Sequence, residues 1–384
     1  MANNNENKIL NVPNLRFPEF CGEWETIKVS ELLDFYSTNS LSWEQLDYSN
    51  GKIKNLHYGL IHKGVPTMVD VACDSLPYIK EESMLKSFTL FKEGDVAFAD
   101  ASEDTNDVAK AIEVVNCDNQ QIVSGLHTIH GRDNSNRTVI GYKGYAFASD
   151  SFHKQIRRIA QGTKVFSISV RNFDEAYIGI PSKEEQTQIA KLLITIDKRI
   201  ATQNKIIDKL KSLIKGIDEV VFQSCSKHCK LKEFDNQITA GRDKVEEGCF
   251  PLYGSTGVIG TTATPSYHEP LVLVARVGSI GCVQFVNIPC GVSDNTIVIR
   301  CGSKAKYVYY YLQNYNFERI TSGTTQPLIT AKDVKHIDIP IIDSANDLKA
   351  INTLDTLNMK LELESNLYNT ILKQKAFLLQ QMFI

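Results

Sequence analysis

A long stretch of this sequence occurs twice, and this internal repeat limits the folds that the chain can adopt. GTKVFSISVRNFDEAYIGIPSKEEQTQIAKLL begins at position 162, and the looser copy GTTQPLITAKDVKHIDIPIIDSANDLKAINTL begins at position 323. Both copies lead from a Gly-Thr pair through an apolar alternation and an Ile-x-Ile-Pro into a helical pattern. Phe222, late in the first helix, pairs with Phe383 in the second. Solenoid repeats have periods of about 20–50 residues, so this longer spacing predicts a whole module that was duplicated and fused.

The bulk composition predicts an ordinary globular protein of the cytoplasm. The chain has 384 residues, which is room for two or three domains, and 42% of them are hydrophobic and 23% charged. No apolar run reaches the ~18 residues that a membrane span needs. The amino terminus, MANNNENKILNV, lacks the features of a signal peptide. Nine cysteines at irregular spacing fit a reducing compartment better than a disulfide framework.

Two local patterns have both a functional and a simpler interpretation. Cys225, His228 and Cys229 have the spacing of half a zinc site, but no second ligand pair follows, so we expect no metal. The net charge of −3 argues against a nonspecific nucleic-acid coat and is compatible with site-specific binding through a local basic cluster. The densest cluster is HKQIRRIAQGTK from position 153, which also fits a solvated surface.

Two segments carry apolar residues with a period of roughly 3.5, which is typical of a coiled-coil seam. The first segment begins at Ser182 as N-cap, and Glu185 completes a capping box. About 40 helical residues form a rod of roughly 60 Å, which is long for the core helix of one compact domain. Gln203 is best explained as a polar position that fixes register. The predicted seam consists of Ile189, Leu193, Ile196, Ile200, Gln203, Ile207, Leu210 and Ile214 in the first helix and Leu354, Leu361, Tyr368 and Ile371 in the second.

The segments outside these helices are rich in turns and β-branched residues, which predicts α+β domains. GDVAFADA resembles PLVLVARVG, and IVSGLHTIH resembles GVSDNTIVI. We expect two globular domains separated by two long antiparallel helices that form an intramolecular coiled coil with pseudo-twofold symmetry. Homodimerisation through either helix is an alternative that the pattern leaves open. The predicted segments are a lead-in over 1–24, a first domain over 25–181, a central helix over 182–224, a second domain over 225–342 and a C-terminal helix over 343–384.

This organisation resembles the specificity subunit of type I restriction-modification systems. The resemblance covers nearly the whole chain, and its most specific motifs are YIGIPSKEEQTQIAKLLITIDKRI, YGSTGVIG and SGTTQPLITAKDVKHIDIP. It implies two target-recognition domains, each reading one half of a split DNA sequence, with the helices as a ruler for the unread gap. The chain departs from the family pattern at Leu60, where an acidic residue often follows the Tyr-Gly seen here at Tyr58 and Gly59. The first domain also lacks a clean YGSTG counterpart.

The resemblance also implies partners. These are double-stranded DNA, two adenine methyltransferase subunits that dock mainly on the helices, and ATP-driven restriction subunits as optional members. S-adenosylmethionine and ATP with Mg would be bound by those partners, and this chain would hold no cofactor and no catalytic residue. In agreement, the sequence has no Walker A loop, no Asn-Pro-Pro-aromatic motif and no Gly-rich cofactor fingerprint. The main alternative is a two-headed coiled-coil adaptor that binds proteins, while the lack of a nucleophile elbow disfavours a hydrolase.

Candidate DNA contacts follow from the residue types that bind phosphates and base edges. Glycine-rich loops let the backbone approach phosphates, Gln326 suits an adenine, and Arg276 suits a guanine or a phosphate. The structural alternatives are a hairpin turn for Gly254 and Gly257, a salt bridge for Arg276 and a polar loop over 322–325. The predicted DNA-binding residues are Arg157, Arg158, Gly162, Thr163, Lys164, Gly254, Ser255, Thr256, Gly257, Arg276, Gly323, Thr324, Thr325 and Gln326.

Overall fold

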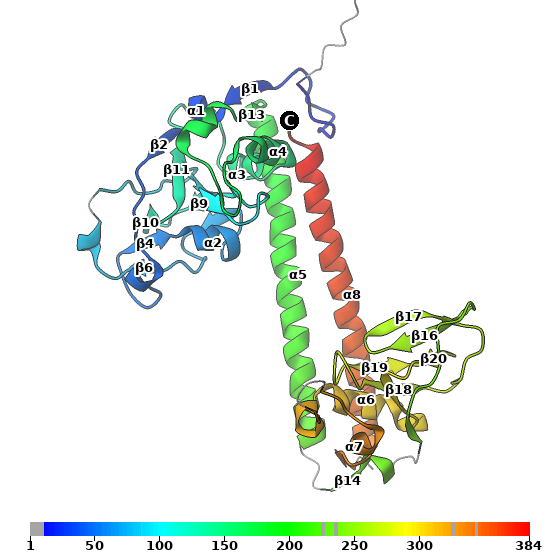
Figure 1. The fold of residues 1–384 in the computed structure, drawn as a ribbon. Helices are drawn as coiled ribbons and strands as arrows, with labels where there is room; N and C mark the ends of the chain where they lie inside the picture. The colour runs from blue at the N-terminus through cyan, green and yellow to red at the C-terminus, as the bar shows by residue number, and fades with distance from the viewer. Residues whose placement is uncertain (1–10, 86, 224–226, 234–236, 324–326, 342–344) are drawn as a thin grey trace, which may run out of the picture. The chain divides into compact units, whose positions relative to one another are not determined.

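The computed structural model of the chain describes residues 11–85, 87–223, 227–233, 237–323, 327–341 and 345–384. The chain divides into two compact units: unit 1 comprises Met1–Asn204 and Leu367–Ile384, and unit 2 comprises Lys205–Asn366. Each unit contains one globular α+β part together with portions of the two long helices (Figure 1). The predicted α+β class with two globular parts is confirmed.

Unit 1 is built around a five-stranded sheet with the fully buried strand β7 (Val96–Ala99) in its centre. A strand covered on both faces needs a continuous apolar run, which the sequence VAFA provides. The sheet order is β2 (Asp34–Tyr36), β11 (Thr128–Arg132), β7, β9 (Ala111–Asn116) and β5 (Met68–Asp70). A second sheet has the order β10 (Gln121–Ser124), β4 (Ile53–Leu56), β6 (Tyr78–Ile79) and β3 (Leu46–Asp47). Two short pairs are β1 (Glu25–Lys28) with β13 (Tyr177–Ile180) and β8 (Ala101–Ser102) with β12 (Phe166–Ser167).

Short helices cover the sheets of unit 1. Phe98 of β7 packs edge-on against Phe147, and Phe147 packs against Phe152, with ring centroids 4.8 and 5.0 Å apart. These aromatic contacts join the central strand to two consecutive helices and form the main core of the unit. The helical elements are α1 (Val29–Leu32), η1 (Trp43–Gln45), α2 (Tyr58–Lys63), η2 (Glu82–Met84), α3 (Tyr142–Phe147), α4 (Asp150–Ile159) and η3 (Val170–Asp174).

Unit 2 repeats this plan on a smaller scale. Its central strand β18 (Leu271–Ala275) is again apolar and fully buried. The main sheet has the order β15 (Ile238–Ala240), β21 (Thr296–Ile299), β18 and β19 (Val283–Val286), and the second has β17 (Gly257–Thr262), β16 (Phe250–Gly254) and β20 (Gly291–Val292). A short pair joins β14 (His228–Lys230) to β22 (Asp338–Pro340). The helical elements are η4 (Leu231–Glu233), η5 (Gly302–Lys304), α6 (Ala305–Gln313), η6 (Phe317–Ile320) and α7 (Ala331–Lys335).

The two long helices are α5 (Lys183–Gln223) and α8 (Ala345–Gln381), with 41 and 37 residues. Within unit 1, Leu193 of α5 shares a core with Met382 after α8, and within unit 2, Phe222 of α5 shares a core with Leu354 of α8. All twelve predicted seam residues are buried or half-buried, Gln203 among them.

In unit 1, two tyrosines of α3 fasten the globular part to the long helices. The Tyr145 hydroxyl donates a hydrogen bond to Asp197 Oδ2 on α5 at 2.7 Å, and the Tyr142 hydroxyl donates to the Gly179 carbonyl of β13 at 2.6 Å. The Tyr142 ring also packs against Phe383, with ring centroids 5.9 Å apart. Burial raises the pKa of both tyrosines, so both remain neutral hydrogen-bond donors at physiological pH.

The same anchor recurs in unit 2, on α6. The Tyr310 hydroxyl donates to Asp355 Oδ1 on α8 at 3.0 Å, and the Tyr307 hydroxyl donates to the Pro340 carbonyl of β22. The Tyr307 ring packs against Phe222 of α5, with centroids 5.7 Å apart. The sequence repeat is therefore also a repeat of contacts, and the predicted match of Phe222 with Phe383 is confirmed.

Two further searches concern the described residues only. No helix among them combines the length and apolar composition that a bilayer span requires. No group of three or more His, Cys, Asp or Glu side chains among them could hold a metal ion. Of the three residues with partial zinc spacing, His228 and Cys229 lie in β14, and Cys225 falls outside the described residues.

Candidate nucleic-acid interface

Both predicted Gly-Thr loops are hairpin loops of the same construction. In unit 1 the loop is closed by reciprocal backbone hydrogen bonds between Gln161 and Ser167, at 3.0 and 2.8 Å. In unit 2 the corresponding bonds join Ser322 and Leu328, also at 3.0 and 2.8 Å. Gly162 has φ +132°, and a Cβ at that position would lie 1.9 Å from the Val165 carbonyl oxygen. Only glycine fits there, which explains why a Gly begins the loop.

In unit 1 the loop is attached at the end of the central strand. The Ile168 N–H donates to the Asp100 carbonyl at 2.9 Å, and the Asp100 N–H donates to the His127 carbonyl at 3.1 Å. Asp100 directly follows β7, and His127 directly precedes β11. The hairpin loop, the end of β7 and the start of β11 therefore meet at one edge of the sheet.

Unit 2 contains the same chain of backbone bonds. The Ile329 N–H donates to the Arg276 carbonyl at 3.0 Å, and the Arg276 N–H donates to the Asn295 carbonyl at 3.1 Å. Thr128 pairs with Ala99 in unit 1, as Thr296 pairs with Ala275 in unit 2. Asp100 and Arg276 thus occupy equivalent positions, and so do His127 and Asn295.

This register corrects one alignment made from the sequence. Matching IVSGLHTIH with GVSDNTIVI letter by letter sets Ser124 against Ser293. In the structure, Ser124 pairs with Leu56 and Val292 pairs with Tyr253 in the two equivalent parallel strand pairs. Ser124 is therefore equivalent to Val292, one residue before Ser293. Backbone hydrogen bonds determine this register, and the shared Val-Ser letters do not.

The predicted segment Gly254–Gly257 is a two-residue β-hairpin turn between β16 and β17, with φ +136° at Gly257. The hairpin alternative is therefore confirmed. The turn is also fixed against the strand ends, because Ser255 Oγ lies 3.3 Å from the carbonyl oxygens of both Val277 and Asn295. Gln284 Nε2 further donates to the Gly254 carbonyl at 2.9 Å. The turn thus belongs to the same edge as Arg276.

Arg276 is half-buried and keeps unused hydrogen-bonding capacity. Its Nη1 approaches the Asp294 carbonyl at 3.4 Å, and its Nε is buried without a hydrogen-bond partner in the described residues. Arg276 forms no ion pair with any described residue, so the salt-bridge alternative finds no support there. A half-buried guanidinium with a spare donor suits an acceptor brought by a ligand, such as a phosphate or a guanine edge.

The basic cluster of unit 1 is only partly available. Arg157 lies 3.7 Å from Asp150 and donates to Asn106 Oδ1 at 3.2 Å, while Lys154 pairs with Asp150 at 2.7 Å. The hydrogen bond from Lys154 lowers the pKa of Asp150, which therefore stays charged. Arg158, in the last turn of α4, is exposed and has no acidic partner among the described residues.

Three further predicted DNA-binding residues lie on the described parts of the hairpin loops. Thr163 and Lys164 are exposed in the loop of unit 1. Gly323, with φ +92°, begins the loop of unit 2. Thr324, Thr325 and Gln326 fall outside the described residues.

Sequence reasoning missed a group of aromatic and polar side chains at this edge of unit 1. Tyr58 lies edge-on to both His62 and His127, with centroids 5.8 and 5.3 Å apart. Together with Val165 of the hairpin loop and residues 101–103, they line a pocket of about 330 Å³. The only available signal was Gly125 in SGLHT, which marks a turn between two strands. In unit 2, the loop RVGSIG, which begins with the predicted Arg276, was marked more clearly by two glycines.

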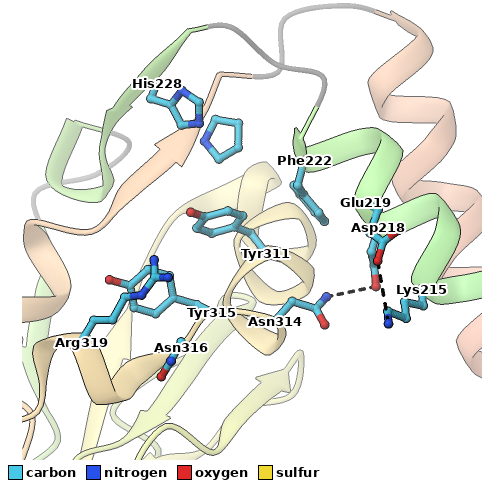
Figure 2. A pocket seen from close by; sticks show the side chains of 11 residues that line it. Lys215, Asp218, Glu219, Phe222, His228, Tyr311, Asn314, Tyr315, Asn316 and Arg319 are labelled. Carbon is cyan, nitrogen blue, oxygen red and sulfur yellow. Dashed lines mark hydrogen bonds and ion pairs between the residues drawn. The ribbon is translucent and has the colours of Figure 1, made fainter.

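A separate cavity of about 670 Å³ lies in unit 2, where α5 meets α6, η6 and the β14–β22 pair (Figure 2). Its polar lining is mostly paired internally. Asn314 donates to Asp218 Oδ2 at 3.1 Å, and Lys215 lies 3.9 Å from Glu219, as the dashed lines show. Tyr311 also donates to the Asp338 carbonyl at 2.6 Å. This cavity is lined by none of the predicted DNA-binding residues.

Comparisons with known proteins point to one group. The family model described as "Type I restriction modification DNA specificity domain" matches residues 22–212 and 229–373. The fold is similar to that of the S subunit of a type I restriction-modification system from M. genitalium, with 18% sequence identity and a TM-score of 0.67 over 97% of this chain and 99% of that chain. It is also similar to a chain from work on complex assembly and conformational transition of the type I R-M system, with 14% identity and a TM-score of 0.52 over 93% and 96% of the two chains. No curated protein sequence matches.

Proposed function

Because the chain belongs to the family of type I restriction-modification DNA specificity domains, we propose that it reads a split DNA target, one half with each unit. It is a DNA sequence-specificity subunit, which contributes recognition and no catalysis to a restriction-modification system. The two reading parts are residues 25–181 and 225–342.

One observation carries the proposal of two half-sites. The hairpin loop, the end of the central strand and the start of its neighbour meet in the same way in both units. The side chains at equivalent positions nevertheless differ, with Asp100 where unit 2 has Arg276 and His127 where it has Asn295. Base edges are distinguished by donor and acceptor patterns. Two frames with different side chains therefore suit two different sequences.

The long helices are assigned the role of a spacer. In this proposal, α5 and α8 pack antiparallel as an intramolecular coiled coil and fix an unread gap of about half to one turn of DNA. Their outer faces dock two methyltransferase subunits, which bind S-adenosylmethionine. Restriction subunits that use ATP and Mg are optional further partners. The expected place of action is the cytoplasm, where chromosomal DNA is accessible.

A methylome tests this function. The chain is co-expressed with its neighbouring methyltransferase subunit in an unmethylated host, and the genome is sequenced for modified adenines. We expect one motif with two short specified halves around a fixed gap. Exchanging residues 25–181 for the corresponding segment of another family member should change one half and leave the other intact.

The methyltransferase expressed without this chain serves as the control and should produce no such motif. A stable co-purified complex that adds no new methylation would contradict the proposal. It would favour the two-headed adaptor that binds proteins.

A further inference from the structure

We propose that two equivalent positions in each unit read bases and that a third equivalent position holds them in place. This inference rests on the proposed function and names the residues that carry it. The positions are Tyr58, Asp100 and His127 in unit 1 and Ser255, Arg276 and Asn295 in unit 2.

The backbone places these positions identically in the two units. The N–H of the second position donates to the carbonyl of the third at 3.1 Å in both, from Asp100 to His127 and from Arg276 to Asn295. Tyr58 and Ser255 each lie two residues after an equivalent strand residue. These strand residues are Leu56, which pairs with Ser124, and Tyr253, which pairs with Val292. The frame is constant, and only the side chains vary.

In unit 2, the polar groups around the loop before β21 lack protein partners. Ser293 and Thr296 are 6% and 0% exposed, yet Ser293 Oγ, Thr296 Oγ1 and Arg276 Nε have no hydrogen-bond partner in the described part of the chain. Asn295 between them is exposed. Buried polar groups are normally paired, so this concentration of unpaired atoms sets the loop around the exposed Asn295 apart from the rest of the described unit.

The side chains of unit 2 match a defined pair of bases. Arginine donates two hydrogen bonds to the O6 and N7 acceptors of guanine, and asparagine bonds bidentately to the N6 and N7 of adenine. Arg276 is half-buried and its Nη1 makes only one long hydrogen bond of 3.4 Å, while Asn295 is exposed. We therefore assign one guanine and one adjacent adenine to the half-site that unit 2 reads.

Unit 1 offers the opposite chemistry at the second position. The side chain of Asp100 is 29% exposed and that of His127 is 51% exposed, and His127 Nδ1 lies 3.1 Å from Asp100 Oδ1. The second carboxylate oxygen remains able to accept a hydrogen bond, and aspartate reads the N4 amino group of cytosine. The edge-on ring of Tyr58 holds the His127 imidazole in place. We assign a cytosine to the half-site that unit 1 reads.

The test measures methylomes of single variants in the co-expressed complex. Arg276→Ala and Asn295→Ala should each relax one base position in one half, and Asp100→Asn should relax one position in the other half. At each such position, discrimination against the wrong base should fall roughly 5- to 150-fold. Asp104→Asn is the matched control in unit 1, because it removes an exposed acid that follows β8, just beyond Asp100 in the chain. Lys232→Ala is the control in unit 2, because Lys232 lies in η4 next to β14, which Figure 1 draws at the other end of this unit from β16.

Several outcomes would overturn the proposal. One is an unchanged motif in all three variants. Another is a uniform loss of methylation by a complex that still assembles, which would assign the residue to the DNA backbone.

Asp100→Gln and Arg276→Gln also serve where a first variant fails to co-purify, because each keeps a polar side chain and changes the donor and acceptor pattern that the assigned base needs. The failure of this inference is distinguishable from that of the proposed function. If the wild-type complex yields no split motif, the function itself is wrong. A normal split motif that these variants leave unaltered refutes only the residue assignment.

Discussion

The two units use one arrangement of strands but stabilise its centre with opposite chemistry. In unit 1, Asp95 is 1% exposed and accepts hydrogen bonds from Arg132 at 2.6 and 2.7 Å. It also shares a hydrogen bond of 2.8 Å with His130 Nε2. In unit 2, the positions equivalent to Asp95 and His130 are Leu271 and Val298, both fully buried.

A second buried pair shows the same contrast. Opposite Val96 on the neighbouring strand lies Glu113, which is 0% exposed and sits 3.2 Å from the Lys143 ammonium. Opposite the equivalent Val272 lies Phe285. Replacing buried ion pairs by apolar residues is often neutral in stability, because desolvation offsets the attraction. The comparison shows that the two units share a strand register, and that either a charged or an apolar set of buried side chains can pack within that register.

The anchor to the helices shows the reverse behaviour, since it is repeated residue for residue. Each unit uses two tyrosines three residues apart, an aspartate on the following long helix and a phenylalanine at the end of the other. The side chains at the proposed reading edge differ at every position. The anchor that joins each globular part to the long helices is therefore kept, whereas the side chains at the proposed reading edge are exchanged.

The largest expected effect breaks the charged centre of unit 1. Asp95→Ala leaves Arg132 and His130 buried without their partner, which should lower the free energy of unfolding by about 3–5 kcal/mol. Urea unfolding measures the loss, and hydrogen exchange should show faster exchange in β7 than in wild type, with β18 unchanged. Glu19→Ala, at an exposed side chain, should cost less than about 0.5 kcal/mol. A loss below about 1 kcal/mol for Asp95→Ala would contradict the role of this cluster.

The second prediction tests whether the two anchors contribute equally to stability. Tyr145→Phe and Tyr310→Phe each remove one hydrogen bond to an aspartate, so each should cost about 1.5–3 kcal/mol. The comparison requires the two costs to be similar. Tyr177→Phe, at a side chain 38% exposed, is the control and should be nearly neutral. If only one anchor variant were destabilised, the two anchors would not be equivalent in energy.

The third prediction uses pH to separate the two centres. Burial acts to raise the pKa of Asp95, but the hydrogen bonds from Arg132 and His130 outweigh it and hold the pKa below its ordinary value of 3.8. The stabilisation is therefore present above pH 3.8 and is lost as the pH falls toward the lowered pKa. Hydrogen exchange of β7 at decreasing pH, corrected for the intrinsic rate, should reveal this loss, with no counterpart in β18 from the apolar Leu271. If hydrogen exchange of β7 were equally sensitive to acid in wild type and in Asp95→Asn, Asp95 would not be the group that causes the loss.

The smallest expected effect concerns DNA affinity. Lys164→Ala and Arg158→Ala should each lower the slope of log affinity against log salt by about one, because each removes one phosphate contact. A salt titration of DNA binding by the assembled complex measures this. Lys232→Ala should leave the slope unchanged. An unchanged slope for both test variants would show that the basic cluster does not contact DNA phosphates.

Much of this architecture could be predicted from the sequence, because its signals are local or repeated. A period of roughly 3.5 over many turns requires a long helix with one buried face, and Leu193 and Leu354 are indeed fully buried. Gly162 marked a loop that only glycine can form, since its φ is positive and a Cβ would meet a carbonyl. The duplicated motifs fixed the number of modules and the family.

Only the tertiary structure decided which side chains meet. Asp100 and His127 are joined by a backbone hydrogen bond between strands distant in sequence, as are Arg276 and Asn295, and no local pattern encodes such a bond. The shared Val-Ser letters suggested a match that was wrong by one residue. Side chains alternate between the two faces of a strand, so a shift of one exchanges inward and outward positions. The sequence alone therefore determined the modules and the helices, whereas hydrogen bonding across the sheets determined the edge at which each unit presents its variable side chains.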